Sequence, residues 1–261
     1  VRAMDATPII KVAGAGALGL TCALALADRG ARVTVHDPAG PGDNASSVAA
    51  GMLAPAFEAV LDPQATPHLA ALMAGRDLWP GLAERIGVPL DRRGALGVGE
   101  SAWLAEAEAR LRNLGLASAR TGRTDDLAPG VTGREGLLVA DDWRLDSLGA
   151  MVALRRACMA AGVSFRSEPV AERGNADLLL AATGEASGLA PELALLQPIK
   201  GHILRLAGPP YGGLTVRAKG IYAAPAADGL ILGATMEPGL SDRTVDPAQT
   251  ARLLQAGLAL F

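Results

Sequence analysis

The stretch that decides the fold is Val12-Ala13-Gly14-Ala15-Gly16-Ala17-Leu18-Gly19, and an acidic residue, Asp37, follows it eighteen residues later. The residues around this stretch predict a strand over 8–13, a helix over 17–28 and a second strand over 31–36. The three glycines then fall at the turn from the first strand into the helix. This order predicts a βαβ unit near the start of the sequence.

Each of the three glycines has a separate use in such a turn. Gly14 permits the tight turn, Gly16 lets a pyrophosphate approach the backbone, and Gly19 lets the helix pack closely on the strand. The first helical turn, with Ala17 and Leu18, offers N–H groups and a partial positive charge to phosphates. The motif predicts an adenine-dinucleotide site; the alternative is a glycine-rich βαβ unit that binds no ligand.

The acid at the end of the second strand narrows the choice of dinucleotide. The Asp37 carboxylate can accept hydrogen bonds from an adenosine ribose. The same charge repels a 2′-phosphate, which disfavours NADP. The motif does not distinguish NAD from FAD.

Composition excludes several classes of partner. Half of the 261 residues are apolar and only 3% are aromatic, so a sizeable core consists mainly of Ala, Leu and Val. The net charge of −3, with dispersed Lys and Arg, gives no basic surface for nucleic acid. The nearly uncharged run 12–27 is shorter than the roughly 20 apolar residues of a membrane span.

The N-terminal residues and the two cysteines indicate the cellular compartment in which we expect the protein. No basic segment with a cleavage site precedes the first strand, so no signal peptide is expected. Cys22 and Cys158 fall in predicted helices among apolar neighbours, which predicts buried free thiols in a reducing compartment. We therefore expect a cytoplasmic protein without a membrane partner.

A long connection over 38–55 follows the second strand and is rich in small residues. Connections of this length are uncommon in compact domains unless they serve a function. Ser46 and Ser47 can donate to phosphate or ring atoms of a ligand, or can cap a short helix. The residues leave both interpretations open.

The rest of the chain changes from helices to strands. Helical spacing occupies 68–86, where Pro80 is expected to kink or divide the element, and the apolar run 177–184 predicts a strand that returns to the first sheet. Asp228-Gly229 predicts a hairpin turn. The remaining predictions are helices over 102–114, 146–161 and 247–261, and strands over 95–98, 136–139, 202–206, 214–216, 221–224 and 230–234.

This order predicts an α/β fold in which a Rossmann-like dinucleotide-binding domain is interleaved with a smaller α+β substrate domain containing an antiparallel sheet. The dinucleotide domain is predicted over 1–60 and 141–190. The substrate domain is predicted over 61–140 and 191–261, with the antiparallel sheet in the second part.

Side-chain motifs for other chemistries are missing from the sequence. The three histidines, His36, His68 and His202, have no metal-ligand spacing, so no metal is expected. The sequence contains neither Gly-x-Ser-x-Gly nor a nucleotide-hydrolysis loop. Few acid–base residues are needed where a cofactor carries the chemistry.

Several segments, in chain order, are similar to one family of flavoproteins. They are Gly14 to Asp37, 46–55 with Ala-Ala-Gly-Met-Leu-Ala-Pro, 182–184, 200–202, 221–225, and 233–239 with Gly-Ala-Thr-Met-Glu-Pro-Gly. The chain resembles the glycine oxidase (thiamine-biosynthesis oxidase) branch of the D-amino-acid oxidase family. The resemblance covers most of the chain, although 166–177 is shorter than the family's usual connection.

The resemblance implies FAD as cofactor. The residues that it places along FAD are Gly14, Gly16, Ala17, Leu18, Gly19, Asp37, Ser46, Ser47, Ala50, Gly51, Met52, Thr183 and Gly184. Family members transfer a hydride from the Cα of a small amino acid or amine to flavin N5, and the imine hydrolyses. O2 then reoxidises the flavin and gives hydrogen peroxide. The family also implies a place in thiamine thiazole synthesis and, in many members, a homo-oligomer.

Two residues match the family's substrate pocket. Tyr222 would bind the substrate carboxylate and Met236 would bound the pocket, without an obligate acid or base. From spacing alone, a Tyr at a strand end and a Met after a strand are more often packing residues than substrate contacts.

Three departures from the family pattern keep alternatives open. Ala226 replaces an Arg after the Tyr-x-x-Pro segment, the Gly-Leu-Arg-Pro segment is not found, and a final Gly-rich segment is not found before Phe261. Either the sequence is part of a longer chain or it is a shortened homologue. A non-catalytic dinucleotide-binding or interaction protein, or a nicotinamide-dependent dehydrogenase, is the alternative to an FAD-dependent oxidase.

Overall fold

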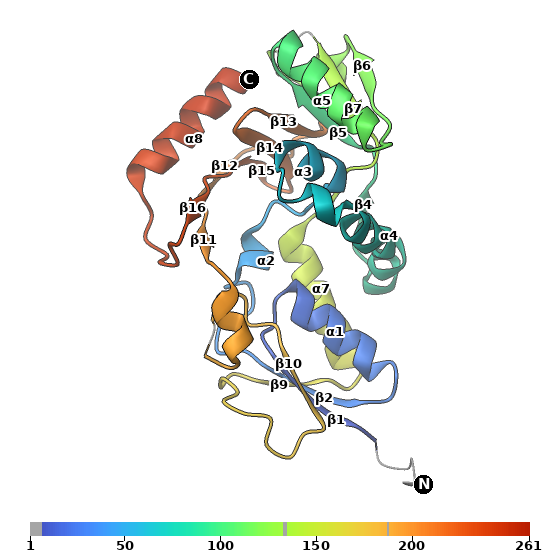
Figure 1. Ribbon diagram of the computed structural model, residues 1–261, viewed down its shortest axis with the longest axis vertical. Coiled ribbons are helices and arrows are strands. Elements are labelled where there is room, and N and C mark those ends of the chain that lie inside the picture. The colour runs from blue at the N-terminus through green and yellow to red at the C-terminus, as the bar shows by residue number, and fades with distance from the viewer. Residues whose placement is uncertain (1–6, 133–134, 187) are drawn as a thin grey trace. The chain divides into compact units, whose positions relative to one another are not determined.

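The computed structural model describes residues 7–132, 135–186 and 188–261. The chain forms two compact units, each built from separate stretches of sequence (Figure 1). Unit 1 comprises Val1–Ala49, Ile86–Val88 and Ser147–Pro198. Unit 2 comprises Ala50–Arg85, Pro89–Asp146 and Ile199–Phe261.

Unit 1 contains a parallel sheet of four strands in the order β10-β1-β2-β9. The strands are β1 (Ile9–Ala13), β2 (Arg32–His36), β9 (Ser164–Arg166) and β10 (Leu178–Ala181). Val12 lies opposite both Val35 and Leu180 and is fully buried. The strand predicted over 177–184 therefore does return to the first strand, as expected for an apolar run in a parallel sheet.

Helices α1 (Ala17–Ala27) and α7 (Ser147–Ala160) pack against each other in unit 1. The buried side chains of α1 include Leu20, Ala23 and Leu24, and the Cys158 thiol of α7 donates to the Leu20 carbonyl. Cys22 lies beside this buried stripe and is only half-buried, so the expectation of two buried thiols holds for Cys158 alone. Unit 1 also contains α2 (Ala45–Val48) and the short 3₁₀ helix η2 (Pro191–Leu195).

Unit 2 is organised around a seven-stranded sheet in the order β12-β15-β14-β13-β5-β7-β6. The strands are β5 (Ala95–Val98), β6 (Ala119–Thr121), β7 (Gly136–Val139), β12 (Ile203–Ala207), β13 (Thr215–Ala218), β14 (Ile221–Ala226) and β15 (Gly229–Gly233). Strands β12 to β15 form the predicted antiparallel set, and β13 continues the sheet by pairing in parallel with β5.

The hairpin between β14 and β15 differs from its prediction by one residue. Ala226 pairs with Gly229, so the turn is 227–228, not Asp228-Gly229. Gly229 has φ +137° and belongs to β15. A Cβ at this position would overlap the Leu206 carbonyl oxygen of β12. Glycine is needed here for close strand approach rather than for the turn itself.

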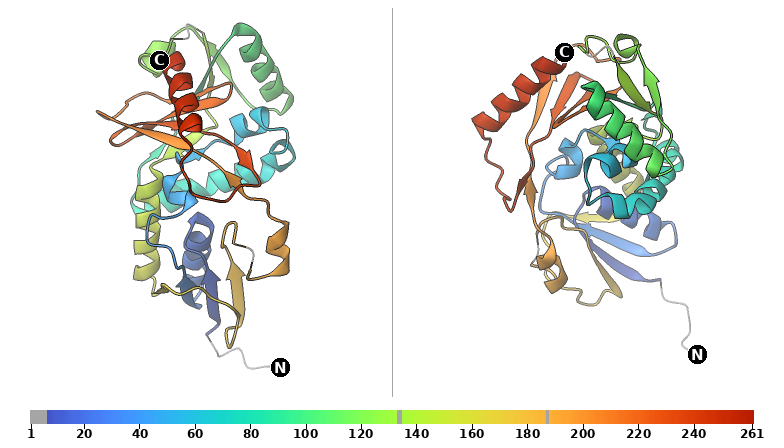
Figure 2. Two further views of the ribbon diagram at one scale, coloured as in Figure 1. Left: turned by 90° about the vertical axis from the view of Figure 1, so that its left-hand side faces the viewer. Right: turned by 45° about the horizontal axis from the view of Figure 1, so that its top comes forward.

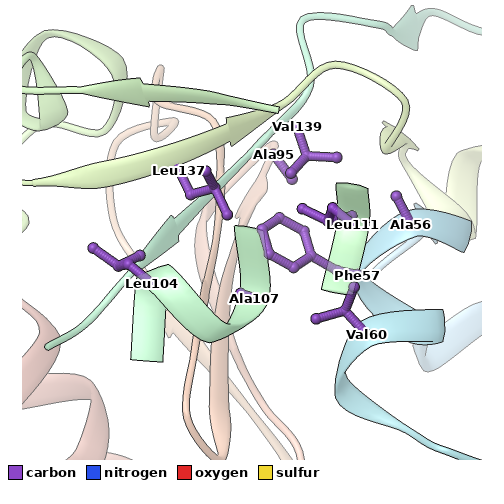
Figure 3. Close-up of a cluster of buried hydrophobic side chains, with 9 residues drawn as sticks. All are labelled: Ala56, Phe57, Val60, Ala95, Leu104, Ala107, Leu111, Leu137 and Val139. Carbon is purple, nitrogen blue, oxygen red and sulfur yellow. The ribbon is translucent and has the colours of Figure 1, made fainter. Parts of the chain in front are cut away.

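Side chains alternate between the two faces of the seven-stranded sheet. One face carries Leu96, Val216, Ala223 and Leu232, and α8 (Pro247–Leu260) lies against it (Figure 2). The opposite face carries Ala95, Leu137 and Val139. These side chains form a cluster with α3 (Pro55–Leu61) and α5 (Ser101–Asn113), and Phe57 lies among them (Figure 3).

The remaining elements of unit 2 are peripheral to this sheet. Pro80 lies inside α4 (Leu69–Ile86) and does not divide it. Small sheets are formed by β3 (Met52–Leu53), β8 (Trp143–Leu145) and β4 (Leu90–Asp91), and by β11 (Ile199–Lys200) with β16 (Glu237–Pro238). The short helices are η1 (Thr66–His68) and α6 (Thr124–Leu127). Among the described helices, none has the length and apolar character to cross a membrane.

Candidate functional site

The turn between β1 and α1 requires glycine for reasons visible in the backbone. Gly14 has φ +103° and donates its N–H to the His36 carbonyl oxygen at 2.7 Å. A Cβ at Gly14 would overlap the Ala182 carbonyl oxygen, and one at Gly19 would overlap the Gly14 carbonyl oxygen. Both glycines thus allow three chain segments to meet at closer range than any side chain permits.

The N-cap residue of α1 is Gly16. Its backbone is extended, and it has no side chain with which to cap the helix. The first turn of α1 contains no acidic residue. A Cβ at Gly16 would lie 3.3 Å from the Ser46 hydroxyl, which accepts the Ala17 N–H at 3.0 Å. Leu18 is exposed. This is a helix end that can receive an anion through its N–H groups and its dipole.

The two serines of the connecting loop have different partners. Asn44 is the N-cap of α2, and its side chain accepts from both the N–H and the hydroxyl of Ser47. Ser46 instead reaches α1, so neither serine caps α2. The signal for Asn44 was present in the sequence as an N-cap residue before a short helix.

Asp37 is tied to the backbone by both carboxylate oxygens. Oδ2 accepts the Ala15 N–H at 2.6 Å, and Oδ1 accepts the Ala39 N–H at 2.8 Å. The first bond holds the glycine turn against the end of β2. A carboxylate has about four acceptor positions, so the predicted ribose contact is compatible with these two bonds. Sequence reasoning missed the structural bond to Ala15.

The end of β10 completes this edge of unit 1. The Ala182 N–H donates to the Ala13 carbonyl oxygen, and the Thr183 hydroxyl donates to the Ala186 carbonyl oxygen. Gly184 follows with φ +64°. In a parallel sheet, the carboxyl ends of adjacent strands form the ligand edge. Unit 1 therefore brings Gly14 and Thr183 to one edge.

Unit 1 fits a dinucleotide pyrophosphate by this geometry. The backbone turn leaves no room for Cβ atoms at Gly14 and Gly19, and it leads into the start of α1, whose N-cap residue, Gly16, has no side chain. Within the described ranges, no group of three or more His, Cys, Asp or Glu residues could hold a metal ion.

Unit 2 contains Ala50, Gly51 and Met52, which the family resemblance predicts along the cofactor. Ala50 is buried, and Gly51 has φ +72° and accepts the Leu145 N–H through its carbonyl oxygen. Met52 pairs with Arg144 between β3 and β8. The Met52 sulfur also accepts from an Arg217 guanidinium nitrogen at 3.3 Å.

Tyr222 lies on β14 beside Arg217 of β13 and Gly233 of β15. A Cβ at Gly233 would overlap the Tyr222 hydroxyl, so this glycine makes room for the phenol. Burial raises the pKa of Tyr222, which keeps the hydroxyl protonated and able to donate. Met236 lies beyond the end of β15 and is 68% exposed.

Arg217 and Glu58 are functional candidates that sequence reasoning missed. Arg217 is buried, and its guanidinium donates to Glu58 Oε1 at 2.9 Å. No local motif marks either residue, because α3 and β13 are far apart in sequence. The only sequence signal for Arg217 is its position five residues before Tyr222.

The fold and the glycine turn define a dinucleotide-binding protein. The chain belongs to the DAO family, described as FAD dependent oxidoreductase, whose model matches residues 10–261. FAD is therefore its cofactor. The glycine motif alone does not distinguish NAD from FAD.

Two solved structures of oxidases share the fold. Glycine oxidase from Geobacillus kaustophilus is 23% identical, with a TM-score of 0.81 over 97% of this chain and 78% of that one. Iminodiacetate oxidase from Chelativorans sp. BNC1 is also 23% identical, with a TM-score of 0.79 over the same shares.

A curated relative is the tRNA 5-methylaminomethyl-2-thiouridine biosynthesis bifunctional protein MnmC from Chromohalobacter salexigens. It is 30% identical over 288 aligned residues. The match covers 100% of this chain but only 41% of that protein.

Proposed function

We propose that the protein oxidises a small amino acid or amine whose nitrogen is attached to a carboxymethyl group, as in glycine. The product imine hydrolyses in water, and O2 is reduced to hydrogen peroxide. FAD supplies the chemistry by accepting a hydride from the substrate Cα at flavin N5. The single observation that carries the proposal is the membership of the chain in the DAO family, together with a unit 1 turn that fits the dinucleotide.

The names of the similar structures support this substrate class. Glycine and iminodiacetate both contain an amine nitrogen bonded to a CH2–carboxylate group, and the two oxidases named for them share the fold. Ala226 stands where the resembled family has Arg, which favours a second candidate, a flavin-binding protein without oxidase activity.

The proposed cofactor contacts divide between backbone and side chains. Gly14, Gly16 and Gly19 would face the pyrophosphate, and Asp37 the ribose. The further residues that we propose along FAD are Ala17, Leu18, Ser46, Ser47, Ala50, Gly51, Met52, Thr183 and Gly184. The protein would thereby hold the flavin and exclude competing orientations, rather than supply an acid or base.

The proposed substrate contacts are Tyr222 and Met236. The protonated Tyr222 hydroxyl would donate to the substrate carboxylate, and Met236 would limit the space beside the amine. Orientation of the Cα is the main demand of hydride transfer, so these contacts would act by positioning. A role in thiamine thiazole synthesis, a cytoplasmic location and a homo-oligomer are proposed from the family resemblance.

Anaerobic flavin reduction tests the proposal. The purified protein, reconstituted with FAD, should be yellow, should bleach on addition of glycine or iminodiacetate, and should release hydrogen peroxide once air is admitted. A protein that stays colourless after reconstitution contradicts the FAD site. Flavin that stays oxidised with a panel of amino acids and amines contradicts oxidase activity and favours the second candidate.

A further inference from the structure

Arg144 of β8 is a partly buried arginine whose hydrogen-bond donors are mostly unused. Its Nε is fully buried and has no hydrogen-bond partner. Among the residues that the structure describes, its one hydrogen bond runs from Nη1 to the Leu145 carbonyl oxygen at 3.1 Å. A guanidinium has five N–H donors, and buried polar groups are nearly always paired. Most donors of Arg144 therefore lack an acceptor in the described part of the chain.

The nearest carboxylate on the same sheet does not pair with Arg144. Asp91 lies opposite it on β4, but Arg93 occupies both Asp91 oxygens, with Nε at 2.9 Å and Nη2 at 2.6 Å. Burial lowers the pKa of Arg144, although the charges of Asp91 and Asp146 oppose this effect. The fold thus removes water from this cation without supplying an ion-pair partner. A buried charge of this kind is stabilised by an acceptor from a ligand.

The neighbours of Arg144 in the three-stranded sheet indicate which ligand can supply the acceptor. Met52 lies opposite Arg144 on β3, as Asp91 does on β4. Directly opposite residues of antiparallel strands have their side chains on the same face of the sheet. Arg144 is therefore the middle residue of a row. The Asp91 end of the row is closed by Arg93, and the other end is Met52.

We infer that Arg144 binds the flavin half of FAD, by donating from Nη2 to an oxygen or nitrogen acceptor of the ring system or its ribityl chain. This inference rests on the proposed function, because the position of Met52 along the flavin is part of that proposal. Arg144 would then hold the half of FAD that carries the chemistry, whereas the glycine turn of unit 1 would hold the adenosine and pyrophosphate.

ADP separates the two halves of the cofactor, because it contains the adenosine and pyrophosphate but no flavin. Serial dilution of the FAD-loaded protein releases FAD, and the recovered FAD fluorescence gives the Kd for FAD. Titration of ADP into the same loaded protein displaces FAD and gives the Kd for ADP. A residue that contacts only the flavin half changes the first Kd and leaves the second unchanged.

Arg144→Met should raise the Kd for FAD by about 20-fold or more, because a charge-assisted hydrogen bond is lost. The Kd for ADP should stay the same. Arg144→Lys keeps the charge without the planar donors, and should raise the Kd for FAD by only about 5-fold. The matched control is Arg92→Met. Arg92 is exposed and stacks on Trp143, with its guanidinium carbon 4.4 Å from the ring centre, and its loss should change neither Kd.

The order of the two Arg144 variants distinguishes binding from packing. If Arg144 only filled space, the apolar Met would replace it better than Lys at a partly buried position. The inference is overturned by a Met variant that binds FAD more tightly than the Lys variant, by an unchanged Kd for FAD, or by equal rises for FAD and ADP. If Arg144→Met does not fold, Arg144→Lys decides: a rise for FAD alone supports the inference, and any other result overturns it.

Failure of the proposed function is distinguishable from failure of this inference. If no amine reduces the flavin but the Arg144 variants lose affinity for FAD alone, the flavin contact stands and the oxidase proposal fails. If glycine reduces the flavin and the Kd for FAD is independent of Arg144, the oxidase proposal stands and this inference is wrong.

Discussion

The two units build their candidate sites from different material. Unit 1 uses backbone: Gly14 and Gly19 allow β1, α1 and the end of β10 to meet without Cβ atoms between them. Unit 2 uses side chains: Arg217 and Tyr222 lie opposite each other on the consecutive strands β13 and β14, and Glu58 reaches Arg217 from α3, which is distant in sequence. A backbone site is encoded by local spacing, whereas a side-chain site depends on which strands become neighbours.

The largest expected effect comes from a Cβ in the backbone site. Gly19→Ala places a methyl group against the Gly14 carbonyl oxygen, which cannot move without disturbing the turn. We expect about 3 kcal/mol of destabilisation and loss of FAD from the purified protein. Thermal unfolding and the flavin absorbance measure the two effects. Gly40→Ala, which meets no atom within 4 Å, is the control and should retain FAD.

The next effect concerns a long-range side-chain contact in unit 2. Asp142 is 1% exposed and accepts the Ala56 and Phe57 N–H groups at the start of α3, at 2.8 and 3.0 Å. Burial outweighs these bonds and raises the pKa of Asp142 from 3.8 to about 6. The folded state therefore favours protonated Asp142.

The stability from this group should be fully present below about pH 4 and should be lost as the pH rises to about 6, a change of about 3 kcal/mol. Urea unfolding of wild-type protein and Asp142→Asn between pH 4 and 7 measures it. The variant lacks the titrating group and should lose this part of the pH dependence. Identical pH slopes would show that Asp142 does not titrate in this range.

A smaller effect is expected when the side-chain site is crowded. A Cβ in Gly233→Ala overlaps the Tyr222 hydroxyl, which is the end of a side chain and can shift. We expect about 1–2 kcal/mol of destabilisation, retained FAD and a higher KM for glycine. Steady-state peroxide release measures the KM. The control is Gly212→Ala, whose added Cβ meets no atom within 4 Å. An equal rise in the KM of this control would show that contact with Tyr222 does not cause the change.

The smallest effect belongs to the side chain that supports the backbone site. Ser46→Ala removes the acceptor of the Ala17 N–H at the start of α1. We expect about 1 kcal/mol of lost stability and an FAD affinity that is weaker by about 3-fold to 5-fold. Quenching of FAD fluorescence on binding gives the affinity. If Ser46→Ala weakened FAD binding as much as Gly19→Ala, side chains would contribute as much as the backbone to FAD binding by unit 1, which contradicts the comparison.

Much of the architecture could be predicted from sequence because its signals are local. The strands 95–98 and 136–139 have the predicted bounds, and the glycine turn follows from the spacing of three residues. The predicted turn at Asp228-Gly229 is one residue too late, and the sequence leaves the role of Ser46 open, because a distant segment decides the role of each residue. Gly229 allows β12 to approach β15 closely, and the Ser46 hydroxyl accepts a hydrogen bond from α1 rather than from its own helix, α2.

The part that could not be predicted is the set of contacts across long sequence separations. Arg217 meets Glu58 across 159 residues, and Asp142 meets Ala56 across 86. No periodicity or capping rule links such positions, because Glu58 and Ala56 lie on α3 and meet their partners only when α3 packs into the core of unit 2. Sequence therefore predicts a dinucleotide site more readily than it predicts the side chains of a substrate site.

The most direct test of the account is a crystal structure of the FAD complex. We expect the pyrophosphate at the turn from Gly14 to Gly19, at the N-terminus of α1, with the adenosine ribose at Asp37. A pyrophosphate bound away from this turn, with the Asp37 carboxylate distant from the ribose, would contradict it.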